Sequence, residues 1–330
     1  MRYESSTTSV SWIPSEAIPG MMRLPFDLGP VHYDDPPGDQ LGDIPTLSRS
    51  GAVRFINELR AWVEVENGLI VGHGHSGRGW IGKTKLGFGS RKILFSAIPM
   101  PDIRSEGEAD KLSVRFAQTT GGRVAMPMRR KLNRPPFVQI VPPLVWTSLA
   151  LTIKADGSSK PEVIGASPFP RHWIYDNAGR LANKVAVTDF KGWAGDIFGE
   201  RTPWGAEDSP AFVTEVETAL ERELSQTIMR GGAKPKVRKL NQGEALVKQG
   251  DAGDELFLLL DGVLSVEVDA KALAEVGPGA ILGERALLEG GKRTATLRAL
   301  TPARVAIASA DQISPDALAE LATGHRREEN

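Results

Sequence analysis

Cysteine is absent from this chain of 330 residues. Its absence excludes disulfides, thiolate catalysis and the usual zinc fingers, and a reduced cytosolic setting is the simplest fit. The formal net charge is only -1, which gives no general attraction to nucleic acid or acidic lipid. No run approaches the roughly twenty apolar residues of a membrane span, and the first residues lack the profile of a signal peptide. We therefore expect a cytoplasmic protein with neither nucleic acid nor membrane as a partner.

Tryptophan is missing from the last part of the chain, because all seven lie before residue 205. A chain of this length exceeds the size at which one hydrophobic core usually stops growing, so more than one domain is expected. The hydrophobic content of 41% is sufficient for full cores. We predict a mainly β protein with a β-rich N-terminal domain at 1–205, a connector helix at 206–232 and a C-terminal domain at 233–330.

Turn signals between short strands characterise the N-terminal domain. Trp62–Glu66 alternates and is followed by Asn67-Gly68, a favoured hairpin turn, and then by an apolar return. Asp156-Gly157 and Asp176–Gly179 separate two further pairs of apolar segments. These patterns predict an antiparallel β-sandwich or barrel, with Gly51–Leu59 as a short helix or the first strand. The first fifty residues are expected to form an irregular, proline-rich wrap.

The connector begins at Glu207-Asp208-Ser209-Pro210, which supplies a capping side chain followed by a proline suited to the first helical position. Apolar residues then recur at three- and four-residue steps until Gly231-Gly232 ends the pattern. They are Phe212, Val213, Val216, Leu220, Leu224 and Ile228. The spacing predicts one amphipathic helix over 209–230 whose apolar face packs against a domain.

Short β segments return after Lys234. They are Val237–Leu240, Ala245–Lys248, Glu255–Leu260, Leu264–Val268, Leu273–Val276, Thr294–Leu300 and Ala303–Ala308, with Asp261-Gly262 as a hairpin turn. With one helical interruption near Glu284, they predict a β-roll or jelly roll. A metal-dependent cupin of this shape would need histidines on its inner strands, and no histidine lies between His172 and His325. We therefore expect no metal site in this domain.

The stretch Leu282–Thr296 carries the strongest functional signal. A glycine-led turn into a short helix at Gly283–Leu288 presents backbone N-H groups at the positive end of a helix dipole, which suits a phosphate. Arg293 adds a planar fork of donors that lysine cannot reproduce. A carboxylate at Glu284 is favourable beside a phosphate only if it accepts a hydrogen bond from a ribose hydroxyl. The stretch therefore predicts a nucleotide phosphate site.

A glycine framework precedes this stretch, comprising Gly243-Glu244, Gly250-Asp251, Gly253–Phe257 and Asp261-Gly262. Together they make Val237–Ala308 resemble the cyclic nucleotide-binding domain family, which includes cyclic AMP receptor proteins, regulatory subunits of protein kinase A and nucleotide-gated channels. The resemblance implies a C-terminal β-roll with a cyclic nucleotide, cAMP or cGMP, as its ligand.

The resemblance also implies a set of ligand-binding residues: Gly283, Glu284, Arg285, Ala286, Arg293 and Thr294. Gly283, Glu284 and Ala286 would contact the phosphate through their backbone, and Arg293 through its guanidinium. Thr294 would bring a hydroxyl to the phosphate and, with guanine, to the purine edge. The side chain of Arg285, like those of Glu289 and Lys292, is expected in solvent.

Two features of the ligand site stay open. Threonine directly after the arginine is similar to channel domains that accept cGMP, but it also occurs where cAMP is preferred, and we favour cAMP. After Ala308 only Pro315–Ala322 could form a short helix, and a polar tail follows from Gly324. The base is therefore poorly capped, or its lid comes from the connector, the N-terminal domain or a second protomer.

The C-terminal domain leaves no room for the helix-turn-helix that follows this roll in bacterial regulators. After Gly232 there are 13 basic and 15 acidic side chains, which also disfavours contact with DNA. We therefore expect a cyclic nucleotide sensor that passes ligand binding through the 209–230 helix to the N-terminal domain. The alternatives are a nucleotide-regulated enzyme with catalysis in the N-terminal domain, and a scaffold whose roll has lost its ligand. In that scaffold a protein carboxylate would neutralise Arg293 and the base pocket would be blocked.

Other candidate sites have ordinary structural interpretations. His73 and His75 share one strand face without a third ligand, and the carboxylates of Tyr33–Asp39 fit a capped loop. Arg129-Arg130-Lys131 with Arg134 fits a solvated turn, while Pro168–Trp173 and Thr202–Gly205 fit core plugs of a β domain. No nucleophile elbow or phosphate loop organises a catalytic set, so we predict no catalytic residue. A homodimer, or a protein partner at the N-terminal domain or the connector, is a further expectation.

Overall fold

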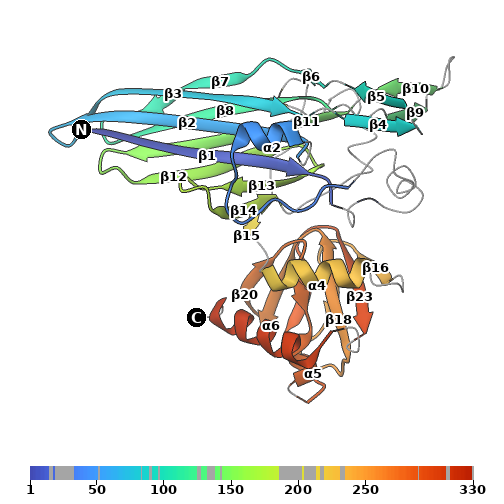
Figure 1. Ribbon diagram of the computed structural model, residues 1–330. Helices are drawn as coiled ribbons and strands as arrows, with labels where there is room; N and C mark the ends of the chain where they lie inside the picture. The colour runs from blue at the N-terminus through green and yellow to red at the C-terminus, as the bar shows by residue number, and fades with distance from the viewer. Residues whose placement is uncertain are drawn as a thin grey trace. The chain divides into compact units, whose positions relative to one another are not determined.

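The computed structural model shows two compact units, Met1–Val213 and Thr214–Asn330 (Figure 1). It describes residues 1–14, 18, 33–50, 53–82, 84–88, 91–95, 97–124, 128–131, 138–141, 143–185, 203, 213–215, 219–230, 235–288, 290–309 and 313–328. None of the helices in these ranges combines the length and apolar character needed to cross a membrane.

Antiparallel sheets build the first unit. One sheet has the order β15-β14-β13-β1-β2-β3, and a second has the order β12-β11-β8-β6 with β7 also paired to β8. Their bounds are β1 Arg2–Trp12, β2 Phe55–Glu66, β3 Leu69–Ile81, β6 Ile98–Pro99, β7 Ile103–Ala109, β8 Ser113–Arg123, β11 Leu144–Lys154, β12 Ser159–Ala166, β13 Arg171–Tyr175, β14 Leu181–Val185 and β15 Val213–Glu215. Further elements are helix α2 (Ile44–Ser50) and the ribbons β4 (Thr84–Phe88) with β5 (Arg91–Phe95) and β9 (Met128–Lys131) with β10 (Val138–Val141).

The two large sheets enclose a shared apolar core, which makes the unit a sandwich rather than a closed barrel. Side chains of β2, β8 and β11 meet in it: Leu59, Ala61, Val63, Val65, Val114, Phe116, Leu149, Leu151 and Ile153. Each of these is almost entirely buried. They recur at every second residue, as expected for strands with one face turned to the core.

The three hairpins predicted from turn residues are confirmed. Asn67 and Gly68 have φ angles of 51° and 76° between β2 and β3, the left-handed pair that this tight turn requires. Gly157 (φ 87°) and Gly179 (φ 73°) close the turns after β11 and β13. The ambiguous segment Gly51–Leu59 contributes residues from Phe55 onward to strand β2, so it is not a helix over that range.

The prediction of an irregular wrap over the first fifty residues is wrong for β1. This strand pairs with β2 over Arg2–Ser11 and with β13 over Thr8–Trp12, so it lies inside its sheet. It is hard to recognise because its buried positions are polar: Thr7, Ser9 and Ser11 are fully buried. Thr7 donates to the carbonyl of Tyr175 at 3.1 Å, and Ser11 lies 2.7 Å from a ring nitrogen of His172. Hydroxyl groups are tolerated in a core when they are hydrogen-bonded.

The second unit is a β-roll of two four-stranded sheets, β16-β23-β18-β21 and β17-β22-β19-β20, as predicted. Its strands are β16 Lys236–Leu240, β17 Ala245–Val247, β18 Glu255–Asp261, β19 Leu264–Val268, β20 Lys271–Val276, β21 Ile281–Leu282, β22 Thr296–Ala299 and β23 Ala303–Ser309. Its helices are α4 Ala219–Arg230, α5 Glu284–Leu288 and α6 Pro315–Glu328. One apolar cluster is formed largely by residues of both sheets, and another joins β18, β21 and β23 to helices α4 and α6.

The predicted connector helix is present but shorter than the 209–230 pattern indicated. It begins at Ala219 as α4, and Val213–Glu215 forms strand β15 instead. A β-branched pair, Val213-Thr214, suits a sheet edge, where backbone groups gain partners along β14. The second half of the apolar stripe behaves as predicted, because Leu224 and Ile228 are buried against the roll. Residues 209–212 and 216–218 lie outside the described part of the chain.

Candidate functional site

The turn into α5 is shaped by a glycine whose conformation other residues rarely adopt. Gly283 follows β21 with a φ of 95°, and α5 begins at the next residue. A Cβ at this position would also lie 2.6 Å from Nη1 of Arg293 and 2.9 Å from the carbonyl oxygen of Glu255. Both the backbone and the space therefore require glycine here. The first N-H groups of a helix have no acceptor within it, so this turn directs donors toward the adjoining space.

Arg293 lies beside that turn and is 95% buried, with an exposure of only 5%. Its Nη1 donates to the carbonyl of Glu255 at 2.9 Å, and its guanidinium lies 4.7 Å from the ring centroid of Phe257. Its Nε is buried and makes no hydrogen bond within the described part of the chain. No carboxylate of a described residue forms an ion pair with it. This arginine is therefore a buried cation with donor capacity left over.

The charge of Arg293 is held in a partly desolvated place. Burial lowers its pKa from the ordinary value, and the nearby carboxylates of Glu255, Asp254 and Glu284 oppose that shift. A guanidinium stays protonated in proteins in any case. The backbone around it is fixed by the loop before β18, since its N-H donates to Asp251 at 2.8 Å and its carbonyl accepts from Gly250 at 2.8 Å. A Cβ on Gly253 would collide with the guanidinium, so the loop passes directly over it.

An open pocket of about 720 Å³, part of it solvent, adjoins these groups. One end is polar and contains Gly283, Glu284, Arg285, Ala286, Arg293 and Thr294. The remaining wall is apolar and comes from β17, β19, β20, β21, β22 and the residue that precedes β22: Val247, Val266, Leu273, Ala274, Val276, Leu282, Leu297 and Ala295. A cavity with a charged end and an apolar wall suits a ligand that joins an anion to a flat apolar group.

All six residues predicted for the ligand site line this one pocket. Glu284 is buried at 3% exposure, Ala286 at 1%, and Thr294 is half-buried. Arg285 is half-buried, so its side chain is less exposed than expected. Lys292 is exposed as expected, and the side chain of Glu289 is outside the described part. That these residues bind a nucleotide stays a prediction.

Sequence reasoning missed the apolar wall and the support under Arg293. Phe257 was recognised only as part of a glycine framework, although its ring lies under the guanidinium. Val266 and Leu273 come from one hairpin, β19-β20, but Leu297 comes from β22, much later in the chain, and only the pairing of β19 with β22 brings it beside them. The available signal was the alternation along β19, where every second residue faces one side.

The C-terminal helix is longer than predicted. A helix over Pro315–Ala322 followed by a polar tail was expected, but α6 continues to Glu328. Asp316 in its first turn favours the helix, and Leu318 and Leu321 are buried against the roll. It contacts α5 and α4, yet no described α6 residue lines the pocket. None of the described residues of α6 therefore serves as a lid over this pocket.

The other candidate sites fit their ordinary interpretations where they are described. Asp34 is buried and pairs with Arg54, so it is not placed for a cation. His73 and His75 pack on the ring of Phe116, with centroids 5.8 and 5.3 Å away. Among the described residues no three metal-ligating side chains gather.

The two aromatic loops were expected to be buried in the core of the first unit. Phe169 and Trp173 are fully buried, as predicted for core plugs. In the second loop, Thr202–Gly205, only Pro203 lies within the described part of the chain. The basic run behaves differently: Arg129-Arg130-Lys131 belongs to strand β9, which pairs with β10, so the expectation of a turn was wrong there. Its side chains and Arg134 lie outside the described part of the chain.

Comparisons with known proteins concern the second unit. Residues 237–315 match the family described as Cyclic nucleotide-binding domain. A cGMP-dependent protein kinase of Plasmodium berghei is 40% identical over 61 residues, which are 18% of this chain and 7% of that protein. A cyclic nucleotide-gated potassium channel of Mesorhizobium japonicum is 38% identical over 66 residues, which are 20% of this chain and 18% of that protein. The chain thus matches less than a fifth of the length of these relatives.

A solved cyclic nucleotide-binding domain from Methylobacillus flagellatus is 25% identical and covers 33% of this chain and 78% of that chain, with a TM-score of 0.27. The matched family residues include β16 to β23 and the whole turn from Gly283 to Thr294. The second unit of this chain therefore contains a cyclic nucleotide-binding domain.

Proposed function

We propose that this chain is a cyclic nucleotide sensor whose second unit binds a 3′,5′-cyclic nucleotide and regulates the first unit. The observation that carries the proposal is Arg293: it is buried, its Nε has no partner among described residues, and it borders a pocket with an apolar wall. Burying a charge is costly unless it is compensated, and a phosphate supplies that compensation.

Each part of a cyclic nucleotide then has a place in the pocket. The cyclic phosphate accepts hydrogen bonds from Arg293 and from backbone N-H groups of Gly283–Ala286 at the start of α5. Glu284 accepts a hydrogen bond from the ribose hydroxyl, which explains a buried carboxylate beside an anion. The purine lies against the apolar wall that includes Val266 and Leu297. The names of the kinase and channel relatives support the same ligand class.

Calorimetric titration of the full chain with cAMP, cGMP and the open-ring 5′-AMP tests the proposal. Wild type should bind a cyclic nucleotide and should bind 5′-AMP more weakly. Arg293→Ala should lower the affinity at least about 100-fold, because two charge-assisted hydrogen bonds are lost. Arg293→Lys should remain impaired, since an ammonium cannot form the planar fork. Lys292→Ala, which removes an exposed neighbouring cation, is the matched control and should bind normally. The absence of heat with both cyclic nucleotides would refute the proposal.

Cyclic AMP is the preferred ligand in this proposal. Most of the pocket wall is aliphatic, and the side chains that can hydrogen-bond are Glu284, Arg285, Arg293 and Thr294. The first three lie at the phosphate and ribose end, which leaves one hydroxyl for the purine edge. Guanine carries more polar edge groups than adenine and would leave more of them unsatisfied. A modest preference for cAMP follows.

Helix α4 is the proposed route to the first unit, because it is the first helix of the second unit along the chain. Glu221 in its first turn is buried and accepts a hydrogen bond from the backbone N-H of Ile281 at 3.0 Å. Ile281 lies two residues before Gly283, so α4 is bonded to the strand that leads into the ligand turn. Hydrogen exchange with and without cAMP should show altered protection in α4 and in strands of the first unit. Changes confined to the second unit would contradict the regulatory half of the proposal alone.

The scaffold alternative is less well supported than the sensor. It requires Arg293 to be neutralised by a protein carboxylate and the base pocket to be blocked. Neither condition is met within the described part of the chain. The enzyme alternative was motivated by aromatic loops, and the described one is buried at Phe169 and Trp173.

A further inference from the structure

A polar groove opens on the first unit and is separate from the nucleotide pocket. It encloses about 1000 Å³, part of it solvent, between the 40–45 segment, the 176–179 turn and strands β1, β2 and β3. All of its lining residues belong to the first unit. Its lining is mostly polar, with Trp80 as the one aromatic side chain.

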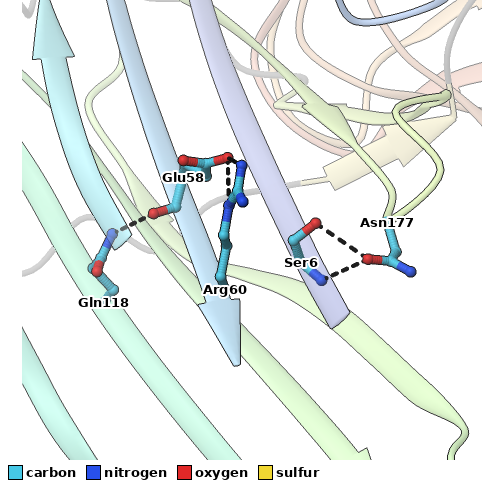
Figure 2. Close-up of polar contacts among 5 residues, drawn as sticks. All are labelled: Ser6, Glu58, Arg60, Gln118 and Asn177. Carbon is cyan, nitrogen blue, oxygen red and sulfur yellow. Dashed lines mark hydrogen bonds and ion pairs between the residues drawn. The ribbon is translucent and has the colours of Figure 1, made fainter. Parts of the chain in front are cut away.

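The floor of the groove is a rung of three side chains on neighbouring strands. Thr8 of β1 is paired with Glu58 of β2, and Glu58 is paired with Arg78 of β3. Glu58 is 93% buried, with 7% exposure, and its Oε1 accepts from both Nε and Nη2 of Arg60 at 2.8 and 2.6 Å (Figure 2). Its Oε2 makes no hydrogen bond to a described residue, so one acceptor remains for a ligand.

The groove is held in place from two sides. The buried Gln118 of the opposite sheet donates from Nε2 to the backbone carbonyl of Glu58 at 2.8 Å (Figure 2). At the other wall, Oδ1 of Asn177 accepts from the backbone N-H and the hydroxyl of Ser6 at 2.9 and 3.2 Å. The amide Nδ2 of Asn177 has no described partner and remains a donor. Side chains fixed in this way lose little entropy when a ligand binds.

Arg78 is the uncommitted cation of the groove. Its guanidinium lies 4.2 Å from the ring centroid of Trp80 and makes no hydrogen bond or ion pair within the described part of the chain. The acidic groups of the groove, by contrast, already have partners: Asp176 is paired with Arg180, and Asp43 accepts from Thr46. An arginine stacked on an aromatic ring is oriented to offer its fork to a carboxylate or phosphate.

We propose that this groove binds a small polyhydroxylated anion, either a sugar acid or a sugar phosphate. The anionic group pairs with Arg78, and ligand hydroxyls donate to Glu58 Oε2 and accept from the Asn177 amide. A simple anion does not fit, because the carboxylates of Glu58, Asp43 and Asp176 repel it and need O-H donors nearby. A lipid does not fit either, since the lining is mainly polar.

Titration of the full chain with D-glucuronate and D-glucose 6-phosphate tests the proposal, with D-glucose, acetate and inorganic phosphate as probes of each half of the ligand. The titrations use the Arg293→Ala background, so that the nucleotide pocket does not contribute. One of the two sugar anions should bind, and the better one identifies carboxylate or phosphate as the anionic group. Arg78→Ala should lower the affinity for this sugar anion at least about tenfold, as expected when a charge-assisted hydrogen bond is lost. Arg78→Lys should recover only part of the affinity.

Arg2→Ala is the matched control, because Arg2 stacks on Trp62 at 4.3 Å on the same sheet but does not line the groove. It should change the affinity by less than about twofold, since it makes no contact with the ligand. The proposal is overturned if neither sugar anion binds at concentrations up to roughly 10 mM. It is also overturned if Arg2→Ala and Arg78→Ala have equal effects, or if glucose, acetate or phosphate binds as tightly as the sugar anions.

Discussion

Two buried arginines, one in each unit, show opposite solutions to the same electrostatic problem. In the first unit Arg54 is almost fully buried, with Nε 2.9 Å from Oδ2 of Asp34 and Nη2 2.8 Å from Oδ1. In the second unit Arg293 is equally buried, but among the described residues it has only the carbonyl acceptors of Glu255 and Gly283 and a ring face. The first cation is neutralised by its own chain. The second has capacity for a ligand.

The difference teaches that burial alone does not distinguish a structural charge from a functional one. The Asp34 carboxylate also accepts from the backbone N-H of Ile13 at 2.8 Å, so that the ion pair joins three segments of the first unit. Arg293 joins the loop around Gly253 to the turn at Gly283, and both glycines are shaped around its side chain. The Arg54–Asp34 pair is closed within the protein, whereas Arg293, the proposed ligand-binding cation, lies against two positions that carry no side chain.

Breaking the Arg54–Asp34 ion pair should have the largest effect on stability. Arg54→Ala leaves the buried Asp34 carboxylate without its partner, and we expect the first unit to lose about 3 to 5 kcal/mol of unfolding free energy. Tryptophan fluorescence in urea measures this unit alone, because all seven tryptophans precede residue 205. Arg180→Ala breaks an exposed pair with Asp176 and should cost less than about 1 kcal/mol. A loss at Arg54 no larger than at Arg180 would contradict the structural role.

Lowering the pH should destabilise the first unit through His172, a buried side chain whose hydrogen bonds are also made within the chain. His172 is fully buried, its Nε2 donates to the carbonyl of Ser167 at 2.9 Å and its Nδ1 accepts from the hydroxyl of Ser11 at 2.7 Å. Burial lowers the pKa of His172 to about 4 from its ordinary 6.5, opposed by the hydrogen bond with Ser167. Above pH 6.5 the His172 ring is neutral in both the folded and the unfolded chain. Below it only the unfolded chain gains the proton, so stability falls with pH until about 4.

Between pH 6.5 and 5, before most carboxylates titrate, the free energy of unfolding should fall by about 2 kcal/mol because of His172. The fall should reach about 3 kcal/mol near pH 4. Urea unfolding followed by tryptophan fluorescence at half-unit steps of pH measures it. His172→Gln cannot titrate and should flatten the profile over this window, even if its stability is lower throughout. A wild-type profile that is already flat from pH 6.5 to 5 would show that His172 is charged in the folded chain.

Removing the Arg293 guanidinium should affect ligand binding more than the stability of the fold. Arg293→Met deletes a desolvated charge without orphaning a carboxylate, so we expect the second unit of the ligand-free protein to change by less than about 1 kcal/mol. Global hydrogen exchange in β18 and β23 measures this unit without relying on tryptophan. Saturating cAMP at about 100 times its dissociation constant should stabilise wild type by roughly 2.7 kcal/mol and leave the variant unchanged. A ligand-free destabilisation as large as that of Arg54→Ala would make Arg293 a structural residue.

The same contrast explains how much could be predicted from the sequence. The turn from Gly283 to Thr294 is local, and its glycine, carboxylate and arginine follow one another within a dozen residues. The hairpin turns are local as well. Strand β1 was missed because its core positions are Thr7, Ser9 and Ser11, and hydroxyls give no apolar periodicity. The partners of Thr7 and Ser11 lie some 160 residues away, and only the folded sheet shows them.

The groove of the first unit could not be predicted for a related reason. Glu58, Arg78 and Asn177 are ordinary surface residue types in strands and turns, and their convergence depends on register. A shift of one residue between β2 and β3 would turn Arg78 away from Glu58. The connector helix was predicted incorrectly for a different reason: Ser209-Pro210 indicated a helix start, but Val213–Glu215 forms strand β15 at a sheet edge. Tertiary pairing therefore outweighed a local preference.

The smallest expected effect concerns the hydroxyl beside the open cation. Thr294 is half-buried next to Arg293 and lines the pocket between the charged end and the apolar wall. If the Thr294 hydroxyl contacts the purine edge, Thr294→Ala should weaken the binding of cGMP by about 1 kcal/mol, which is roughly fivefold. The same change should weaken the binding of cAMP by less than about twofold. Thr294→Ser keeps the hydroxyl and should retain the wild-type ratio. Competition between the two nucleotides measures that ratio directly. Equal losses for both would place the hydroxyl at the phosphate instead, where it would act with Arg293 on a group that the two ligands share.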